Sequence, residues 1–317
     1  MVAPGRHCPL HYRTDPAALD RAPDLTAETL YVIGGLYGNT AALGAVLELA
    51  ADEVAAGQPA PALLFNGDFN WFNADAATFD RVNTEVLRHH ALQGNVEAEL
   101  ASPDDDAGCG CAYPAWVDDA TVERSNRIMA RLQATAREQP AHVEALGRLP
   151  RQLRVQVGPV SVGVIHGDPE SLAGWGLAVE AMPPRGETPP QLASWFRRAA
   201  VDVFACTHTC LPFAQAFTAG GRARLVVNNG ATGMPNVRGD RRGILTRIST
   251  RPAVPEQRLY GTTVGGVHCD AVAADCVTPA WEEWFRRVWP ADSPAAVSYG
   301  TRLRQGPDHG LSDADRL

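Results

Sequence analysis

Four side chains of the kind that bind metal ions follow apolar runs in this sequence. Asp68 comes directly after Gly67 and an apolar run, and Asn95, His166 and His208 each follow a similar run beside glycine or another small residue. A buried strand that ends in Gly-Asp delivers its carboxylate to the carboxyl edge of a sheet, which is where open α/β sheets bind ligands. We therefore expect the four side chains to converge.

Together these side chains predict a site for one divalent transition metal ion. Two imidazoles, a carboxylate and an amide oxygen form a mixed nitrogen and oxygen set that suits Mn, Fe, Zn or Ni rather than Ca or Mg. Each residue alone has an ordinary structural explanation, such as a turn or cap for Asp68 or a satisfied structural role for a histidine. Their joint occurrence at successive strand ends favours the metal site.

Strand and helix patterns alternate around these residues. Short apolar runs rich in β-branched residues indicate strands, and apolar residues on one face indicate helices. The predicted strands cover residues 29–33, 62–65, 201–205, 243–249 and 257–277, with hairpins at 153–165 and 213–228. The predicted helices cover residues 40–56, 74–89, 118–147 with a break at Pro140, 191–200 and 279–289.

The two ends of the chain look less regular than its middle. Residues 1–28 are polar and broken by proline, and we expect a surface lead-in there. His7, Cys8 and His11 lie close together in it, but no second cluster of ligands completes a metal site. The last 25 or so residues are expected to form a loosely ordered tail.

The composition is that of an ordinary globular chain. Hydrophobic residues make up 45% of the 317 residues and charged residues 20%, so a sizeable core is available. No internal repeat or flexible linker is evident. We expect one α/β domain over residues 1–317, with a core at about 29–250 and a C-terminal extension at 251–317.

Charge, hydropathy and cysteine usage argue against several classes of function. A net charge of −8 gives no support to a nucleic-acid or acidic-membrane partner. No apolar run approaches the roughly 18 residues of a membrane span, and the first residues lack the apolar core of a signal peptide. Seven cysteines, an odd number, favour reduced thiols in a cytoplasm over a disulfide framework. The oligomeric state is left open.

The order of five short motifs resembles the calcineurin-like metallophosphoesterases, most closely their small bacterial phosphodiesterase branch. The resemblance covers about residues 29–250, and the order and spacing of the motifs carry it although each is altered. The stretch from Asn229 to Pro235 also resembles that branch's Asn-Pro-Gly-Ser-Val-Gly-Gln-Pro turn. The five motifs are Gly38-Asn39, Gly67-Asp68, Gly94-Asn95, His166-Gly167 and the run from His208 to Phe213.

The resemblance implies a four-layer α/β/β/α sandwich, in which two mixed sheets are flanked by helices. It also implies an active site with two metal ions, bridged by an aspartate and by a hydroxide that attacks phosphorus in line. In that chemistry the cations neutralise the anionic ester and lower the pKa of bound water. The implied reaction is hydrolysis of a small phosphate mono- or diester.

The departures from the family pattern fall on one of the two metal sites. The family's first motif is Asp-x-His-Gly-Asn, and Gly35 and Tyr37 stand in place of its two ligands. In the later Gly-His-x-His motif, Cys210 replaces the second histidine. By the resemblance, these three positions serve one metal. Because random decay would not sort the losses so cleanly, we infer selection for a one-metal site. The retained ligands serve the other metal: Asp68, Asn95, His166 and His208.

Some replacements could carry new roles. Tyr37 could hydrogen-bond a substrate oxygen that the second metal would have polarised, with Asn39 also on the substrate side. Cys210 could join Cys109 or Cys111 as thiolate ligands of a softer ion, in a second site of another form. The alternative is a plain Cys-x-Cys loop near Asn95 without a ligand role, since two thiols at this spacing lack a second pair.

Three functions are compatible with this pattern. The first is a hydrolase of phosphate esters that works through one retained metal and its water. The second is an inactive protein of the same fold with a binding or regulatory role, favoured by the three lost ligands and by Val96 in place of a family histidine. A structural protein without metal is disfavoured by the four retained ligands. Loops 100–118 and 169–190 and the C-terminal region are expected to set the substrate, which the sequence does not reveal.

Overall fold

The computed structural model describes residues 4–317, and strand β2 (Thr29–Ile33) shows how its layers form. All of β2 is buried, although successive side chains of a strand point to opposite faces. Leu30 and Val32 pack into an apolar core between two sheets, whereas Tyr31 and Ile33 pack into a core shared with helices. Strand β2 therefore has a second sheet on one side and helices on the other.

Strand β2 belongs to a mixed six-stranded sheet with the order β11-β12-β10-β2-β3-β4. Strands β2, β3 and β4 run parallel, so their carboxyl ends meet at one edge, while β10 runs antiparallel to β2. The other strands of this sheet are β3 (Ala62–Asn66), β4 (His90–Leu92), β10 (Gly243–Ser249), β11 (Arg258–Val264) and β12 (Val267–Ala274).

The second sheet has seven strands in the order β1-β5-β6-β7-β9-β8-β13. Its central strands β6, β7 and β9 are parallel, and β5 and β8 pair with them in antiparallel hairpins. Its strands are β1 (Leu25–Ala27), β5 (Gln152–Val157), β6 (Val160–Ile165), β7 (Val203–Cys206), β8 (Phe213–Ala219), β9 (Arg222–Asn228) and β13 (Asp315–Arg316).

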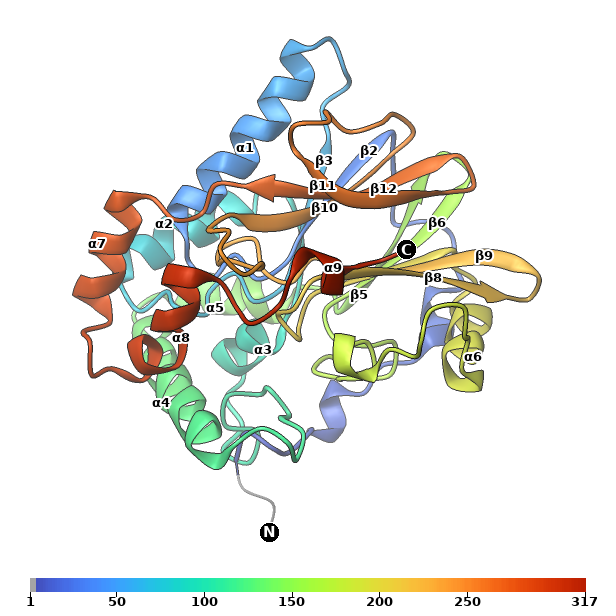
Figure 1. The fold of residues 1–317 in the computed structure, drawn as a ribbon. Helices are drawn as coiled ribbons and strands as arrows, with labels where there is room; N and C mark the ends of the chain where they lie inside the picture. The colour runs from blue at the N-terminus through green and yellow to red at the C-terminus, as the bar shows by residue number, and fades with distance from the viewer. Residues whose placement is uncertain (1–3) are drawn as a thin grey trace.

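Helices cover the outer face of each sheet, as Figure 1 shows, with α1 and α7 on one side of the molecule and α6 on the other. Short 3-10 helices lie at Leu10–Tyr12, Pro16–Leu19 and Val179–Ala181. The α-helices among residues 4–317 are α1 (Thr40–Ala55), α2 (Ala76–Val86), α3 (Asn95–Ala101), α4 (Asp119–Ala136), α5 (Pro140–Gly147), α6 (Pro190–Ala199), α7 (Pro279–Val288), α8 (Pro294–Gln305) and α9 (Leu311–Ala314).

The predicted α/β sandwich of two mixed sheets flanked by helices is confirmed. The break predicted at Pro140 is also present, because Pro140 opens α5 at a position where its missing N–H costs nothing. Within residues 4–317, no helix is both long enough and apolar enough to cross a bilayer.

The expectation of a loosely ordered C-terminal tail is wrong. Ser293 caps α8, its side chain accepting from the N–H of Ala296, and α8 packs Leu303 into the core beside α4. Strand β13 then pairs in parallel with β8, so the last residues form an edge strand of the second sheet. Ser293-Pro294 is a sequence signal for the start of a helix, but the many polar residues that follow it suggested a tail.

The expectation of a plain surface lead-in before residue 29 is also wrong. Residues 1–3 lie outside the described part of the chain, and beyond them Tyr12 and Leu19 are fully buried. Strand β1 adds to the second sheet by pairing in parallel with β5. The described part of the N-terminal segment is therefore packed into the fold and is not a surface lead-in.

Candidate metal centre

The four predicted ligands lie where parallel strands of both sheets end. Asp68 follows β3, His166 follows β6 and His208 follows β7. Asn95 differs from the prediction, because it is the first residue of helix α3 rather than the end of a strand. Gly67 permits the convergence: it has φ +77°, and a Cβ there would lie 2.6 Å from both the backbone of Gly94 and Nδ1 of His166.

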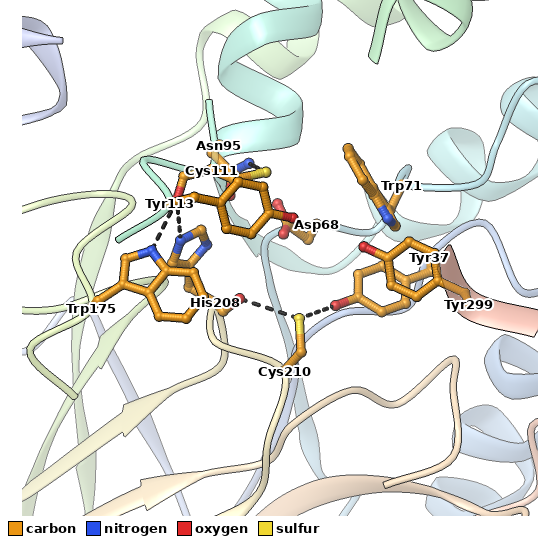
Figure 2. A pocket seen from close by; sticks show the side chains of 10 residues that line it. All are labelled: Tyr37, Asp68, Trp71, Asn95, Cys111, Tyr113, Trp175, His208, Cys210 and Tyr299. Carbon is orange, nitrogen blue, oxygen red and sulfur yellow. Dashed lines mark hydrogen bonds between the residues drawn. The ribbon is translucent and has the colours of Figure 1, made fainter. Parts of the chain in front are cut away.

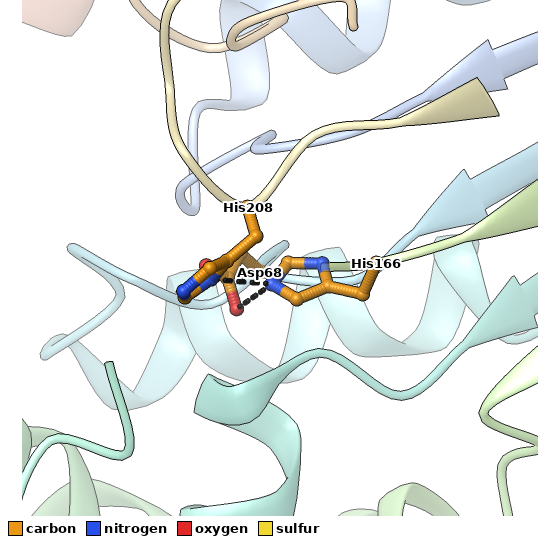
Figure 3. A group of neighbouring side chains, drawn as sticks. All are labelled: Asp68, His166 and His208. Carbon is orange, nitrogen blue, oxygen red and sulfur yellow. Dashed lines mark hydrogen bonds and ion pairs between the residues drawn. The ribbon is translucent and has the colours of Figure 1, made fainter. Parts of the chain in front are cut away.

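The structure brings the four side chains together in a buried cluster, and Figure 3 shows three of them, Asp68, His166 and His208. Nε2 of His166 lies 3.3 Å from Oδ1 of Asp68, 3.1 Å from Oδ1 of Asn95 and 3.2 Å from Nδ1 of His208. Within residues 4–317, the only group of three or more His, Cys, Asp or Glu side chains whose ligand atoms gather this closely is Asp68, His166 and His208.

Neighbouring backbone groups fix the orientation of each side chain. Nδ1 of His166 donates to the carbonyl of Asn66 at 2.8 Å, and Nε2 of His208 donates to the carbonyl of Cys111 at 3.1 Å. Nδ2 of Asn95 donates to the carbonyl of Cys109, which turns its amide oxygen inward. In neutral imidazoles held this way, the inward nitrogens carry lone pairs.

When both imidazoles are neutral, four acceptor atoms face one another, and either a metal ion or a proton on His166 resolves this arrangement. Ligands about 2.1 Å from a tetrahedral ion lie roughly 3.4 Å apart, close to the separations of this cluster. The outer hydrogen bonds of both histidines to carbonyls are those that orient imidazole ligands in metal sites. The residues present fit one divalent transition metal ion.

The charge of the Asp68 carboxylate also favours one positive charge in the cluster. Burial lowers the pKa of His166, but the Asp68 carboxylate more than offsets this, so the pKa is raised above its usual value. Burial and the neighbouring His166 lower the pKa of His208 to about 4. Burial raises the pKa of Asp68, but His166 and His208 outweigh it and leave that pKa low. A metal ion and a proton on His166 are alternative ways to supply the charge.

Sequence reasoning missed Glu97, which holds the Asp68 turn. This fully buried carboxylate accepts from the backbone N–H of Asp68 at 2.7 Å and from that of Gly94 at 3.1 Å. Burial, with a further contribution from Asp68, raises the pKa of Glu97 to about 7. Asp68 has φ 54°, a conformation that non-glycine residues rarely adopt, and the Glu97 contact stabilises it. The sequence signal that could have revealed this role is the position of Glu97, two residues after Asn95.

Tyr37 lies between Gly35 and Cys210, the other two positions at which the resemblance places ligands of a second metal. The hydroxyl of Tyr37 lies 2.8 Å from Sγ of Cys210, which itself donates to the carbonyl of His208. A Cβ on Gly35 would lie 3.0 Å from Cζ of Tyr37, so the phenol ring occupies the space that a longer side chain at position 35 would need. Burial raises the pKa of Tyr37, and Cys210 and Asp68 raise it further, so the phenol stays neutral.

The structure does not gather the three cysteines into a ligand group. Cys109 is fully buried, and its sulfur accepts from the backbone N–H of Cys111. Cys111 reaches the cluster through its carbonyl, which accepts from both His208 and Trp175. Burial raises the pKa of Cys111 and Cys210, so both remain thiols at neutral pH. Within residues 4–317, these sulfurs form no close cluster of three ligands.

A small cavity opens onto the cluster (Figure 2). Its volume is about 50 Å³. The loops 100–118 and 169–190 and the C-terminal region all contribute to its wall, through Tyr113, Trp175 and Tyr299 respectively. The full set of lining residues is Tyr37, Asp68, Trp71, Asn95, Cys111, Tyr113, Trp175, His208, Cys210 and Tyr299.

The expectation that Asn39 lines the substrate side is wrong. Asn39 caps helix α1, its Oδ1 accepting from the N–H groups of Ala41 and Ala42. Its Nδ2 donates to the carbonyls of Gly233 and Cys276, and the side chain is fully buried. All its polar atoms are used, so it stabilises the start of α1 rather than binding a ligand.

Solved structures identify the fold. No protein-family model matches the sequence, and no curated protein matches it. A hypothetical protein from Pyrococcus horikoshii OT3 matches 89% of this chain and 99% of its own, at 14% identity and a TM-score of 0.57. A metallophosphoesterase from Sphaerobacter thermophilus matches 88% of this chain and 100% of its own, at 16% identity and a TM-score of 0.54. The chain therefore has the metallophosphoesterase fold, and the resemblance is confirmed at that level.

Proposed function

We propose that this chain is a metal-dependent phosphoesterase that hydrolyses a small phosphate mono- or diester with one divalent metal ion. The observation that carries the proposal is the convergence of four inward acceptor atoms in a buried cluster that opens onto a cavity. Asp68, Asn95, His166 and His208 would hold the ion. When bound there, Mn, Fe, Zn or Ni would polarise a phosphoryl oxygen and lower the pKa of a bound water.

Tyr37 is the side chain that we place on the substrate. Its neutral hydroxyl lines the cavity and donates to Cys210, whose own hydrogen is engaged with a carbonyl. A phosphoryl oxygen is a better acceptor than a thiol sulfur, so the hydroxyl can turn to it when substrate enters. In this proposal the phenol replaces part of the charge stabilisation that a second metal would give.

The second candidate is an inactive protein that binds a phosphate ester without hydrolysing it. The cavity supports this alternative, because the positions of the second metal site hold a tyrosine and a thiol, and Val96 stands where the family has a histidine. Both candidates bind the metal, so metal analysis alone does not separate them. The cytoplasmic location and the single-domain organisation stay predictions.

Turnover separates the two candidates. Hydrolysis of bis-p-nitrophenyl phosphate by the wild-type protein with added Mn²⁺ should be detectable, and Asp68→Asn should abolish it by removing the only carboxylate in the cluster. The control is Asp80→Asn, since Asp80 is an exposed residue of α2. Metal binding without hydrolysis of mono- or diesters would favour the inactive alternative. Equal activity in wild type and Asp68→Asn would contradict the assigned site.

A further inference from the structure

The cavity at the metal cluster is small, with a volume of about 50 Å³, and it is open to solvent on one side. A phosphoryl group beside the predicted metal ligands lies at its inner end, so the ester group of a substrate extends toward the mouth. The side chains of the mouth therefore select the ester group.

The mouth is aromatic and carries no cationic side chain. Among residues 4–317, the partly exposed residues of the cavity wall are Tyr113, Trp175, Cys210 and Tyr299, and no lysine or arginine lines it. The ring of Trp175 stands edge-on to the ring of His208 at 5.6 Å between centroids and lies 5.9 Å from that of Tyr113. Rings of this kind present flat apolar faces to a ligand.

Trp116 packs against Trp175 of this aromatic wall and is itself at the surface. Its ring stands edge-on to that of Trp175, with centroids 6.2 Å apart, and its exposed fraction is 64%. Single exposed apolar residues are common and need no function by themselves. Trp116 is distinguished by its place, because it is one ring away from a ring that contacts a predicted metal ligand.

The turn that carries Trp116 is held rigidly. The N–H of Val117 donates to the carbonyl of Pro114 across the turn at 3.1 Å. Arg6 donates to both flanking carbonyls, that of Pro114 at 2.8 Å and that of Val117 at 2.5 Å, and pairs with Asp119. An exposed tryptophan on a turn fixed at both ends is ready to stack without a large loss of entropy on binding.

We propose that Trp116 is a stacking surface for the ester group of the substrate, and that this group carries a flat aromatic ring such as an aryl group or a nucleobase. The inference rests on the proposed function, since it places the phosphoryl group in the cavity beside the metal. It adds the substrate class: a phosphate ester whose aromatic ring lies against Trp116 outside the cavity. Trp116 contributes to binding and does not take part in the chemical step.

Calorimetric titration of the Mn²⁺-loaded protein with phenylphosphonate and with methylphosphonate tests the inference. Trp116→Ala should raise the Kd of phenylphosphonate about 5- to 10-fold, as expected for the loss of one stacked ring. Trp116→Phe should restore most of the affinity, and the Kd of methylphosphonate should not change. The control is Val254→Ala, which alters an exposed side chain that does not line the cavity.

Hydrolysis of methyl esters, followed by the methanol released, shows which kind of ring binds, because their leaving group carries no ring. In Trp116→Ala, KM should rise for methyl phenylphosphonate or for the methyl ester of thymidine 5′-phosphate, while kcat stays within twofold. A rise with one of them assigns the ring as aryl or nucleobase, and a rise with both assigns a general stacking surface.

Three results would overturn the inference. The first is an unchanged Kd for phenylphosphonate in Trp116→Ala. The second is an equal loss of affinity for phenylphosphonate and methylphosphonate in that variant. The third is that phenylphosphonate does not bind to the metal-loaded wild type. Turnover of bis-p-nitrophenyl phosphate with an intact metal count would then show that the proposed function survives. Absence of both metal and turnover would show that the proposed function has failed as well.

Discussion

Tyr37 and Cys210 determine what chemistry the pocket can perform. Both are non-glycine residues with positive φ, at 57° and 62°, and their side chains meet at 2.8 Å. Such backbone conformations cost free energy and are kept where the surroundings enforce them, often at functional sites. The pair gives the pocket a neutral hydrogen-bond donor.

Tyr37→Phe tests this role at the residue scale. Removal of the hydroxyl should lower kcat by about 10-fold, because one preorganised donor to the developing phosphoryl charge is lost. The metal count should stay the same, since the phenol is not a ligand in this account. Tyr113→Phe is the matched control, because its hydroxyl lines the same wall but is bonded to Ser125. An unaltered rate in Tyr37→Phe would make Tyr37 a packing residue.

Helix α3 connects the metal cluster to the N-terminal segment. Asn95 begins the helix, and Glu99 one turn later accepts from the hydroxyl of Tyr12 at 2.5 Å and from the N–H of Asp104 at 2.9 Å. Gly110 is needed beside them, since a Cβ there would lie 2.5 Å from the Tyr12 hydroxyl. One carboxylate thus ties the N-terminal segment and the Cys-x-Cys loop to the helix that carries Asn95.

Glu99 predicts a pH dependence of stability. Burial raises the pKa of Glu99 to about 7, although Tyr12 and Asp104 donate to it. A carboxyl that binds its proton more tightly in the folded chain gives full stability below its unfolded pKa of about 4.3, and loses it as pH rises through 7. The loss should be on the order of 4 kcal/mol. Glu99→Gln should reduce the slope of the free energy of unfolding against pH between about pH 4.5 and 7, and the part that is due to Glu97 should remain; an unchanged slope would contradict the assignment.

Helix α8 shows why the C-terminal segment was misjudged. Its sequence is polar enough to suggest a tail, but Arg302 donates to the carbonyls of Pro235 and Cys210, and Leu303 is buried against the core. These partners are distant in the sequence, so local patterns give no sign of them. Local patterns sufficed for strand β3 and helix α1, whose apolar runs and breakers are complete within each segment.

Leu303→Ala tests whether α8 belongs to the cooperative structure. Truncation of this buried side chain should lower the free energy of unfolding by about 2–3 kcal/mol. Val297→Ala on the same helix is the control: Val297 is 56% exposed, and its truncation should change stability by less than about 0.5 kcal/mol. Chemical denaturation measures the free energy of unfolding of both variants. Equally small decreases in Leu303→Ala and Val297→Ala would mean that α8 is detached in solution.

At the scale of the whole molecule, the family resemblance predicted the sandwich, and the rule that the ends of parallel strands meet at one edge predicted the convergence of the four candidate ligands. Local patterns could not predict Glu97, Trp175 or Tyr299 as parts of the site, since these come from two helices and a loop whose position depends on tertiary packing. Asn39 was wrongly placed on the substrate side for the same reason, because the sequence does not distinguish an asparagine that caps a helix from one that contacts a substrate.

The charge of the pocket predicts a preference between ester classes. One divalent ion with Asp68 and with Glu97, whose pKa of about 7 leaves it mostly ionised at pH 8, gives a net charge near zero, and no arginine or lysine among residues 4–317 lines the cavity. A monoanionic diester therefore brings less uncompensated negative charge into the site than a dianionic monoester. We therefore expect kcat/KM for bis-p-nitrophenyl phosphate to exceed that for p-nitrophenyl phosphate at pH 8. The reverse order would indicate a further cation in the site.

The central claim is that one metal site has been kept and the other replaced. Elemental analysis of protein purified without chelator tests it most directly, with His166→Ala and the exposed His11→Ala as paired variants. The account predicts about one transition metal ion per chain in the wild type and in His11→Ala, and almost none in His166→Ala. Two ions per chain, none in the wild type, or full occupancy in His166→Ala would contradict it.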